Sequence, residues 1–330
     1  MAGRKLVLVL VAAAAVFAAR PAGAQEISFL GGAIHSAPLH DHTYAWSLEF
    51  LQGLGERSAL SFAYLNEGHL PGHRRDGQTF QLWRRALFFR RRLSLAAGLG
   101  PYFYYDTTGP ARPGGFRDDH GWGAVASAAA TWYLPGRLTA QIRLNWVETA
   151  NRFDTASVLA GLGYQLSPPP PGGGPRPRPP HQASWTTRNA VTLLAGRTIV
   201  NSYSAEYALA QSIEYRRGIG RYWDASVAWL NEGDTRLVRR NGVIAQVWAT
   251  RVFPGGHLDL ALGGGTYVAV DQRRTPRPGE SGRGAVAGIV SLRAGVRFAG
   301  HWEIPLVWNR IVTGYNRDTD VLLAGLGYRF

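Results

Sequence analysis

Cysteine is absent from the 330 residues, and lysine occurs only once, as Lys5. Without cysteine the fold has no disulfide bond and no cysteine-bound metal. Long apolar runs are also missing beyond residues 6–19, which argues against membrane-spanning helices in the rest of the chain. A β-barrel remains compatible with this sequence, because only alternate residues of its strands face lipid.

The first 24 residues have the features of a secretory signal peptide. Arg4 and Lys5 precede an apolar run over residues 6–19, and Ala22-Gly23-Ala24 provides a small-x-small cleavage site. The alternative is a membrane anchor, but the run is too short to span a bilayer comfortably. We therefore expect cleavage before Gln25 and export of the mature chain.

The charge balance is strongly basic, with 36 Lys and Arg residues against 22 Asp and Glu residues. After loss of Lys5, every basic side chain is an arginine. A GC-rich genome would explain this preference. Bidentate binding of lipopolysaccharide phosphates by guanidinium groups would also explain it. We expect no nucleic-acid partner, because the chain is predicted to be exported.

The last stretch of the chain, residues 318–330, alternates with a period of two. Leu322, Ala324, Leu326, Tyr328 and Phe330 form one face, and the intervening residues are mostly small or polar. This period predicts a β-strand. One apolar face ending in two aromatic residues is typical of a barrel strand that faces lipid.

A second copy of this strand lies at residues 154–166, which indicates an internal duplication. The halves also match at Leu65-Asn66-Glu67-Gly68 with Leu230-Asn231-Glu232-Gly233, and at Gln81-Leu82-Trp83 with Gln246-Val247-Trp248. A repeat of this length is a duplicated domain. We predict domains at 25–166 and 185–330, separated by a proline- and glycine-rich periplasmic linker at 167–184.

Eight strands are predicted in each half. In the first half they lie near 26–34, 42–51, 58–66, 77–88, 92–105, 120–134, 137–149 and 153–166. In the second they lie near 187–199, 203–215, 222–231, 242–253, 257–270, 284–298, 301–313 and 318–330. Short turns at 52–56 and 134–137 and longer polar loops at 66–77 and 106–119 suggest the two sides of an outer-membrane barrel.

The predicted fold class is an all-β, antiparallel transmembrane barrel, arranged as two tandem eight-stranded barrels. One sixteen-stranded barrel is the alternative, and a secreted β-sandwich is a more distant one. Two barrels are favoured because each half has its own closing strand. Small residues at Ala124, Ala126, Ala128 and Ala130 also suggest a crowded lumen.

The final strand resembles the C-terminal signal of bacterial outer-membrane β-barrels, which closes on Phe. This resemblance implies an outer-membrane location and recognition of the Phe330 strand by the barrel-assembly machinery. Each half is also similar in size and ending to the lipid A deacylase (acyloxyacyl hydrolase) family, which implies a His-x-Ser pair on the penultimate strand. Residues 145–149 and 309–313 contain neither His nor Ser. We therefore assign no catalytic residues, and a role without enzymatic activity is favoured over the alternative of a lipid A-modifying enzyme.

Polar residues kept in both halves, together with nearby arginines, define two candidate sites. A polar network in the lumens is predicted from Glu49, Gln81, Arg143, Asn145, Glu214, Gln246 and Asn309, with Arg143 as the partner of Glu49. Ligand binding at the outer mouths is predicted from Asn66, Glu67, Arg75, Asn231, Glu232, Arg239, Arg240, Arg310, Arg317 and Asp318. Thr149 and Asp154 are expected to complete the mouth of the first half.

An anionic ligand, such as a lipopolysaccharide phosphate, is expected to prefer Arg239, Arg240, Arg310 and Arg317 of the second half. The alternative is that these arginines pair internally with Glu232, Asp318 and Asp320. A structural Arg–carboxylate network, with Asn-Glu-Gly shaping a loop, is the simpler interpretation of both candidate sites.

No cofactor or metal site is assigned. His35 and Ser36 are neighbours on a strand and would point to opposite sides. His40 and His42 are placed in one loop, and His69 and His73 in another, so their spacing is weak evidence for metal binding.

Three functions are compatible with these features. The first is a structural or ligand-binding outer-membrane barrel whose partners are membrane lipid and lipopolysaccharide. The second is a porin-like channel, which would need one wide barrel. The third is a lipid A-modifying enzyme, suggested only by the polar rim.

Overall fold

A computed structural model describes residues 25–109, 115–170, 173–175, 189–203, 205–253, 255–274 and 284–330. The predicted signal peptide, residues 1–24, and residues 176–184 of the predicted linker lie outside the described part. The chain forms two compact units, one for each half. Among the described residues, no helix is long and apolar enough to cross a membrane.

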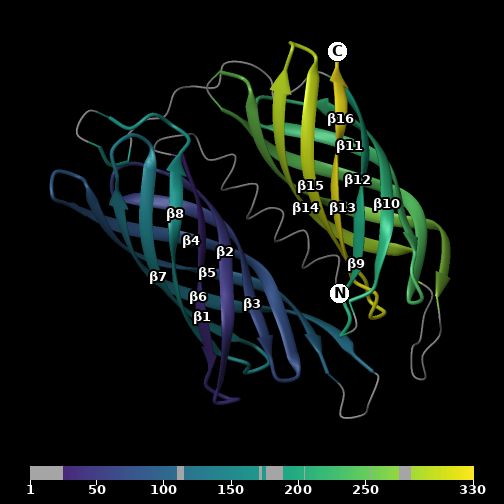
Figure 1. Ribbon diagram of the computed structural model, residues 1–330, viewed down its shortest axis with the longest axis horizontal. Coiled ribbons are helices and arrows are strands. Elements are labelled where there is room, and N and C mark those ends of the chain that lie inside the picture. Colours follow the sequence, from purple (N-terminus) through teal and green to yellow (C-terminus); the bar gives the residue numbers. More distant parts are fainter. Residues whose placement is uncertain are drawn as a thin grey trace. The chain divides into compact units, whose positions relative to one another are not determined.

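The first unit is a closed antiparallel barrel in which each strand pairs with the next and β8 pairs with β1 (Figure 1). Its strands are β1 (Gln25–Ser36), β2 (Asp41–Gly53), β3 (Ser58–Leu70), β4 (His73–Phe88), β5 (Leu93–Thr108), β6 (Arg117–Tyr133), β7 (Leu138–Thr149) and β8 (Thr155–Gln165). The predicted strands are present, and most of them are longer than expected.

The second unit is a separate closed barrel in which β16 pairs with β9. Its strands are β9 (Asn189–Val200), β10 (Tyr207–Gly218), β11 (Trp223–Asp234), β12 (Val238–Val252), β13 (Leu258–Arg274), β14 (Val286–Phe298), β15 (Trp302–Val312) and β16 (Thr319–Arg329). Two eight-stranded barrels are thus confirmed. The single sixteen-stranded barrel and the β-sandwich are both wrong, because each half closes on itself.

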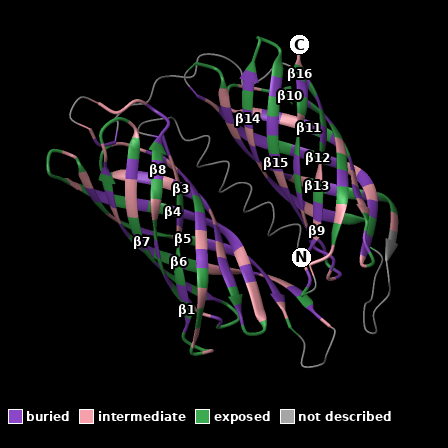
Figure 2. Cartoon of the chain, viewed as in Figure 1, coloured by how far each residue is buried: buried purple, intermediate pink, exposed green. Residues whose placement is uncertain are grey.

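Burial alternates along the strands, as expected when one face lines a filled interior (Figure 2). On β7, Ile142 is 58% and Trp146 is 59% exposed, whereas the intervening Arg143 is 2% exposed. On β16, Leu322 and Leu326 are exposed and Leu323 is buried. The period-two pattern therefore assigns apolar side chains to the outside and polar or small ones to the inside.

One expectation about the lumen is wrong. The alanines predicted to line it are on the outward face of β6, where Ala124, Ala126 and Ala128 are exposed. The buried face of the same strand carries Val125 and Ser127. Alternation alone identifies two faces of a strand but does not say which of two uncharged faces is inside.

An apolar layer crosses the interior of each barrel. In the first barrel it consists of Leu30, Ile34, Ala45, Leu65, Tyr102, Tyr104, Val125, Val147 and Leu159. In the second barrel the corresponding cluster is larger and includes Leu194, Leu230, Ile244, Trp248, Tyr267, Ile289 and Val321. An eight-stranded barrel is narrow enough for side chains to fill it, and these layers do so.

The Asn-Glu-Gly segments form β-bulges within strands and not loop corners. The register of β3 with β4 shifts between Asn66 and His69, and that of β11 with β12 between Asn231 and Asp234. In each bulge the Asn side chain accepts a hydrogen bond from the Gly amide, at 3.0 Å for Gly68. Gly68 has φ 67°, a left-handed conformation that favours glycine.

The predicted polar loops are correspondingly short. Strand β3 continues to Leu70 and β4 begins at His73, so residues 66–77 are mostly strand. Strand β5 likewise continues to Thr108 and β6 begins at Arg117. The polar composition misled the prediction, because at these strand ends the polar side chains bond to one another across the barrel.

Part of the predicted linker packs on the first barrel. Gln165 Nε2 donates to Gly174 O at 3.0 Å, and Arg91 Nη2 donates to Pro175 O at 2.8 Å. Arg91 Nη1 also donates to Glu56 Oε1 at 2.6 Å. This hydrogen bond and the charge of Arg91 lower the pKa of Glu56. Gly174 and Pro175 of the predicted linker are therefore hydrogen-bonded to the first barrel.

Candidate functional site

A buried ion pair closes the first barrel at the end that carries the β1–β2 and β3–β4 turns. Arg75 and Glu67 are 2% and 1% exposed and form a bidentate pair, with Nη2 to Oε1 at 2.9 Å. Tyr102 OH donates to Glu67 at 2.8 Å, and Arg75 donates to Thr155 Oγ1 at 3.0 Å. Side chains from β3, β4, β5 and β8 therefore satisfy both charges.

The second barrel has the same arrangement. Arg240 donates to both oxygens of Glu232 at 2.7 Å and to Thr319 Oγ1 at 2.9 Å. Tyr315 OH accepts a further bond from Arg240 at 3.2 Å, and the guanidinium lies 5.9 Å from the Tyr267 ring centroid. In both predicted mouths, the arginine of the buried pair therefore uses Nε, Nη1 and Nη2 in hydrogen bonds within its barrel.

These contacts bear on the predicted anion site of the second half. Arg240 and Arg310 form the internal pairs that were the alternative, with Arg310 Nη1 2.6 Å from Asp320 Oδ2. Arg317 is buried and donates to the carbonyls of Leu237 and Asn316, and Asp318 accepts from the Thr313 amide. Arg239 is different, because its side chain is 44% exposed and lies 3.6 Å from Asp271.

A hydroxyl–amide chain crosses the middle of each lumen. Gln81 Nε2 donates to Ser127, Ser127 donates to Asn145, and Asn145 donates to Ser157, all at 2.7–3.0 Å. In the second barrel Gln246 donates to Ser291, which donates to Asn309. The structure thus joins the predicted lumen amides into one network in each barrel.

A buried tryptophan lies next to each network. Trp83 Nε1 donates to Ser61, and Trp248 Nε1 donates to Ser226, both at 2.8 Å. A guanidinium covers each indole: Arg143 lies 5.1 Å from the Trp83 ring and Arg216 lies 4.1 Å from the Trp248 ring. The desolvated cation is stabilised by the ring and by a nearby carboxylate.

The two guanidinium groups come from different strands. Arg143, on β7, pairs with Glu49, as the sequence suggested. Arg216, on β10, lies 3.4 Å from Glu214 and 3.6 Å from Asp224. Each indole is therefore covered by a guanidinium group, which comes from β7 in the first barrel and from β10 in the second.

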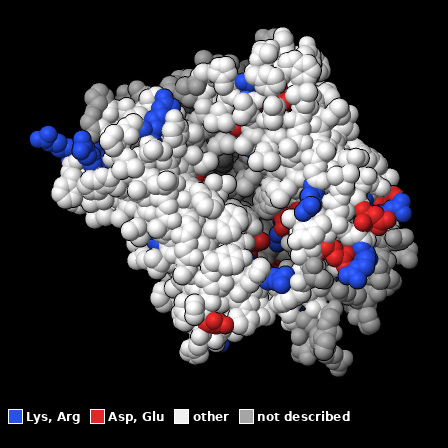
Figure 3. Space-filling view, viewed as in Figure 1, with Lys and Arg blue, Asp and Glu red and all other residues white. Residues whose placement is uncertain are grey.

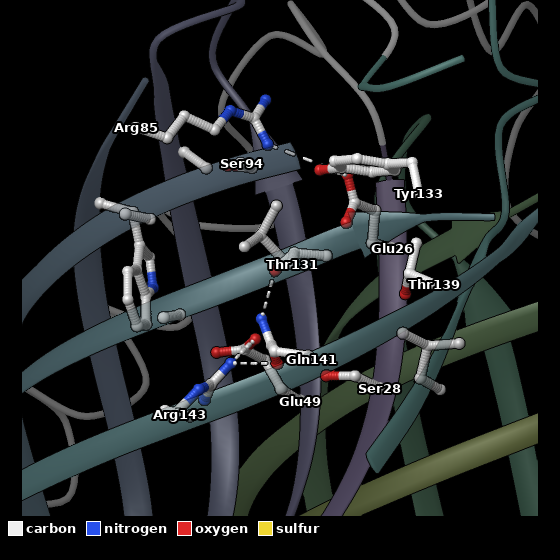
Figure 4. Close-up of a pocket in the computed structure, with 16 residues that line it drawn as sticks. Glu26, Ser28, Glu49, Arg85, Ser94, Thr131, Tyr133, Thr139, Gln141 and Arg143 are labelled. Atoms are coloured by element: carbon white, nitrogen blue, oxygen red, sulfur yellow. Dashed lines mark hydrogen bonds and ion pairs between the residues drawn. The ribbon is translucent and has the colours of Figure 1, made fainter. Parts of the chain in front are cut away.

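A small polar cavity in the first barrel is lined by Glu26, Glu49, Arg85, Arg143 and other side chains, with Trp83 among them (Figure 4). Its volume is about 30 Å³, room for about one or two water molecules. Arg143 donates to Gln141 at 3.1 Å, and Gln141 donates to Thr131 at 2.9 Å. Arg85 and Glu26 also line the cavity and form an ion pair at 3.8 Å.

Charged residues occupy the corresponding depth of the second barrel. Arg293 bonds to Asp259 and to Glu303, the latter at 2.6 Å, and Arg297 lies 2.9 Å from Asp259. Counting from Gly98 and Gly263, which face the two indoles, Asp259 stands where the first barrel has Ser94. Both lumens are therefore filled, one around a small polar cavity and one with a salt-bridge network.

Sequence reasoning missed several members of these networks. Tyr102, Tyr267 and the two tryptophans are kept in both halves, and that signal was available. Arg216 and Asp224 could not be found in this way, because they have no charged counterpart in the first half.

The inward face of β7 carries Arg143 and Asn145 without His or Ser. His73 Nδ1 lies 2.7 Å from Asp106, and its ring stacks on Phe153 at 3.9 Å. Within the described part of the chain, no three His, Cys, Asp or Glu residues are grouped to hold a metal ion. The prediction that four histidines lie in loops is correct for His40. It is wrong for His42, His69 and His73, which lie in strands.

No protein-family model and no curated protein matches this sequence. Among solved structures, the chain is similar to the N-terminal β-barrel domain of Pseudomonas aeruginosa OprF, with 9% identity and a TM-score of 0.35, covering 43% of this chain and 98% of that one. It is also similar to Ail, the attachment invasion locus protein of Yersinia pestis, with 9% identity and a TM-score of 0.32, covering 43% and 97%.

Proposed function

We propose that this chain is an integral outer-membrane protein with a structural or lipid-binding role and no catalytic site. The carrying observation is the apolar outward face around a filled interior in each barrel. On the side shown in Figure 3, uncharged side chains cover most of the surface. Exposed Phe29, Leu82, Ile142, Leu193 and Leu306 would be costly in water but suit hydrocarbon.

Fractionation tests this location. The mature protein is expected in outer membranes and should migrate differently on a gel before and after heating, as closed barrels do. Cleavage before Gln25 should appear as the N-terminus of the purified protein. Recovery of folded mature protein from the soluble periplasm would contradict the proposal.

Assembly through the last strand is part of the same proposal. Tyr328 ends the outward face of β16, and Phe330, which directly follows the strand, is 58% exposed. The barrel-assembly machinery would recognise this strand, and a Phe330→Ser variant should accumulate outside the membrane. The paired networks of the two barrels support an origin by duplication of one eight-stranded unit.

Lipopolysaccharide is the proposed lipid partner. Arg197 is exposed on the outward face of β9, 5.2 Å from the Tyr207 ring and next to Leu209 and Leu322 in the register. A guanidinium near the end of an apolar face can pair with a lipid phosphate. An Arg197→Gln variant should retain less lipopolysaccharide during purification. The control variant Arg84→Gln should retain the normal amount, because Arg84 lies at the opposite end of its own barrel, near the turn from β4 to β5.

A lipid A-modifying activity is the competing function. Mass spectrometry of lipid A from cells with and without the gene separates the two. Identical spectra are expected, because neither penultimate strand offers a nucleophile and a base.

A further inference from the structure

Most of the histidines lie at one end of the first barrel, the end with the β1–β2 turn. They are His35, His40, His42, His69, His73 and His120. The second barrel has no histidine on the corresponding described strand ends; His257 and His301 lie at its other end. This end of the first barrel therefore concentrates the side chains that bind transition metals best in the absence of cysteine.

Several of these imidazoles already have partners. His73 bonds to Asp106, His69 packs edge-on against Tyr44 at 5.8 Å, and His120 does the same with Tyr105 at 5.8 Å. In contrast, within the described residues no hydrogen bond ends on the imidazole of His35 or His42. Of these two side chains, only His42 has an ion-pair contact in the described part of the chain, with Asp41 at 3.9 Å.

His35 and His42 face each other across two strands. They are direct partners in the antiparallel register of β1 and β2, next to the turn that joins these strands. Both are exposed, and the His42 side chain is 84% exposed, while Ile34 and Ser36 on either side of His35 are buried. The two imidazoles therefore leave the sheet on the same outward side. Facing residues have Cβ atoms about 4.5–5.5 Å apart, a separation at which two imidazoles can reach one ion.

The surroundings favour a cation. Asp41 Oδ1 lies 3.9 Å from His42 Nδ1 and accepts the His42 amide at 2.7 Å. Without a bound ion, a facing pair of histidines gains little and is destabilising when both are protonated. A divalent cation bound by both imidazoles would instead link the two strands and stabilise the pair.

The structure assigns a surface site for a divalent transition metal to His35 and His42. Two imidazole nitrogens suit Zn²⁺, Ni²⁺ or Cu²⁺ and not Mg²⁺ or Ca²⁺, which prefer oxygen ligands. Since no third protein ligand is grouped with them among the described residues, the other positions are open to water or a soluble ligand. The site is thus exchangeable, and it does not depend on the proposed lipid role.

The second barrel provides a matched control. Ile199 and Tyr207 are the facing partners on β9 and β10, beside the turn that joins those strands. This pair has the same place in the topology but no metal ligand. Any binding that follows from general features of the barrels would be the same in both halves.

Cu²⁺ titration of the full mature chain, refolded in detergent without a polyhistidine tag, tests the site. Electron paramagnetic resonance should show one ion bound by two imidazole nitrogens. His35→Gln or His42→Gln should weaken binding at least about tenfold, since even loss of a second-shell partner commonly costs that much. His69→Gln should bind normally, and Zn²⁺ should displace the Cu²⁺.

A variant that creates the same metal site in the second barrel separates loss of metal binding from misfolding. Ile199→His with Tyr207→His should bind a second ion with the same two-nitrogen signature while keeping heat-modifiable migration. Unchanged affinity in both single His35 and His42 variants would overturn the assignment. So would an equal loss in His69→Gln, or a graft that folds but binds no second ion.

Discussion

At the scale of single residues, the most constrained side chains are arginines inside the lumens. Arg75 and Arg240 each place a guanidinium against a buried glutamate, a tyrosine and a threonine hydroxyl. A buried ion pair is weak evidence of net stabilisation, because desolvation offsets most of the attraction. Removal of one of the two charged side chains is nevertheless destabilising, since the remaining charged group stays buried without its ionic partner.

Arg75→Met is expected to destabilise the first barrel by about 3–5 kcal/mol, because Glu67 would remain buried without its cationic partner. Arg75→Met combined with Glu67→Met should recover much of this loss. Urea unfolding in detergent micelles, followed by gel migration, measures both. Equal destabilisation by the single and double variants would contradict a charge-based cause.

Close packing at Gly98 gives a second test. A Cβ added there would lie 2.6 Å from the Trp83 ring, whereas one added at Gly31 would have nothing within 4 Å. Gly98→Ala should therefore cost about 1–3 kcal/mol of unfolding free energy, the usual range for overpacking. Gly31→Ala, the control, should be close to neutral in the same assay.

At the scale of strands, both barrels have a guanidinium over the buried tryptophan, but the strand that supplies it differs between them: β7 in the first barrel and β10 in the second. Leu51 and Arg216 face the serines bonded to the indoles, Ser61 and Ser226, and so hold equivalent places. Two residues before Asn309, the second barrel has Val307 in place of an arginine. The interior preserves the charge over the ring but not the strand that supplies it.

This equivalence predicts a compensated exchange. Arg143→Val should destabilise the first barrel by about 3–5 kcal/mol, because Glu49 loses its partner. Adding Leu51→Arg and Ala59→Asp, which copies the second barrel, should restore most of the stability.

Urea midpoints of the single and triple variants measure this exchange. A triple variant that is no more stable than Arg143→Val would show that the two lumens are not interchangeable.

At the scale of the whole molecule, the chain consists of two closed barrels, each with a filled interior. The first interior contains a cavity of about 30 Å³, and the second contains linked salt bridges at the same depth. Apolar layers cross both. Neither lumen resembles the water-filled passage of a wide porin.

The purified protein is therefore expected to give no porin-sized conductance steps in planar bilayers. Glu67→Ala with Arg75→Ala removes the seal of the first barrel and should at most produce small, brief currents. Large steady steps from the unaltered protein would contradict the filled lumens.

The sequence by itself determined the fold class, the number of strands and the outward face of most of them. Period-two alternation is a local property, and Leu322, Leu326 and Ile142 show it directly. The repeated closing strand at 154–166 also favoured two barrels, because a barrel closes by pairing its last strand with its first. The Glu49–Arg143 pair followed from inward charges that needed partners.

Only the tertiary structure decided which inward residues meet. Arg75 and Glu67 bond to Thr155, eighty and more positions along the chain, because closure brings β8 beside β1 and across from β4. Strand extension converted the expected polar loop at 66–77 into a bulged hairpin. The tilt and closure of the barrel set these contacts, and no local spacing in the sequence encodes a distance across a lumen.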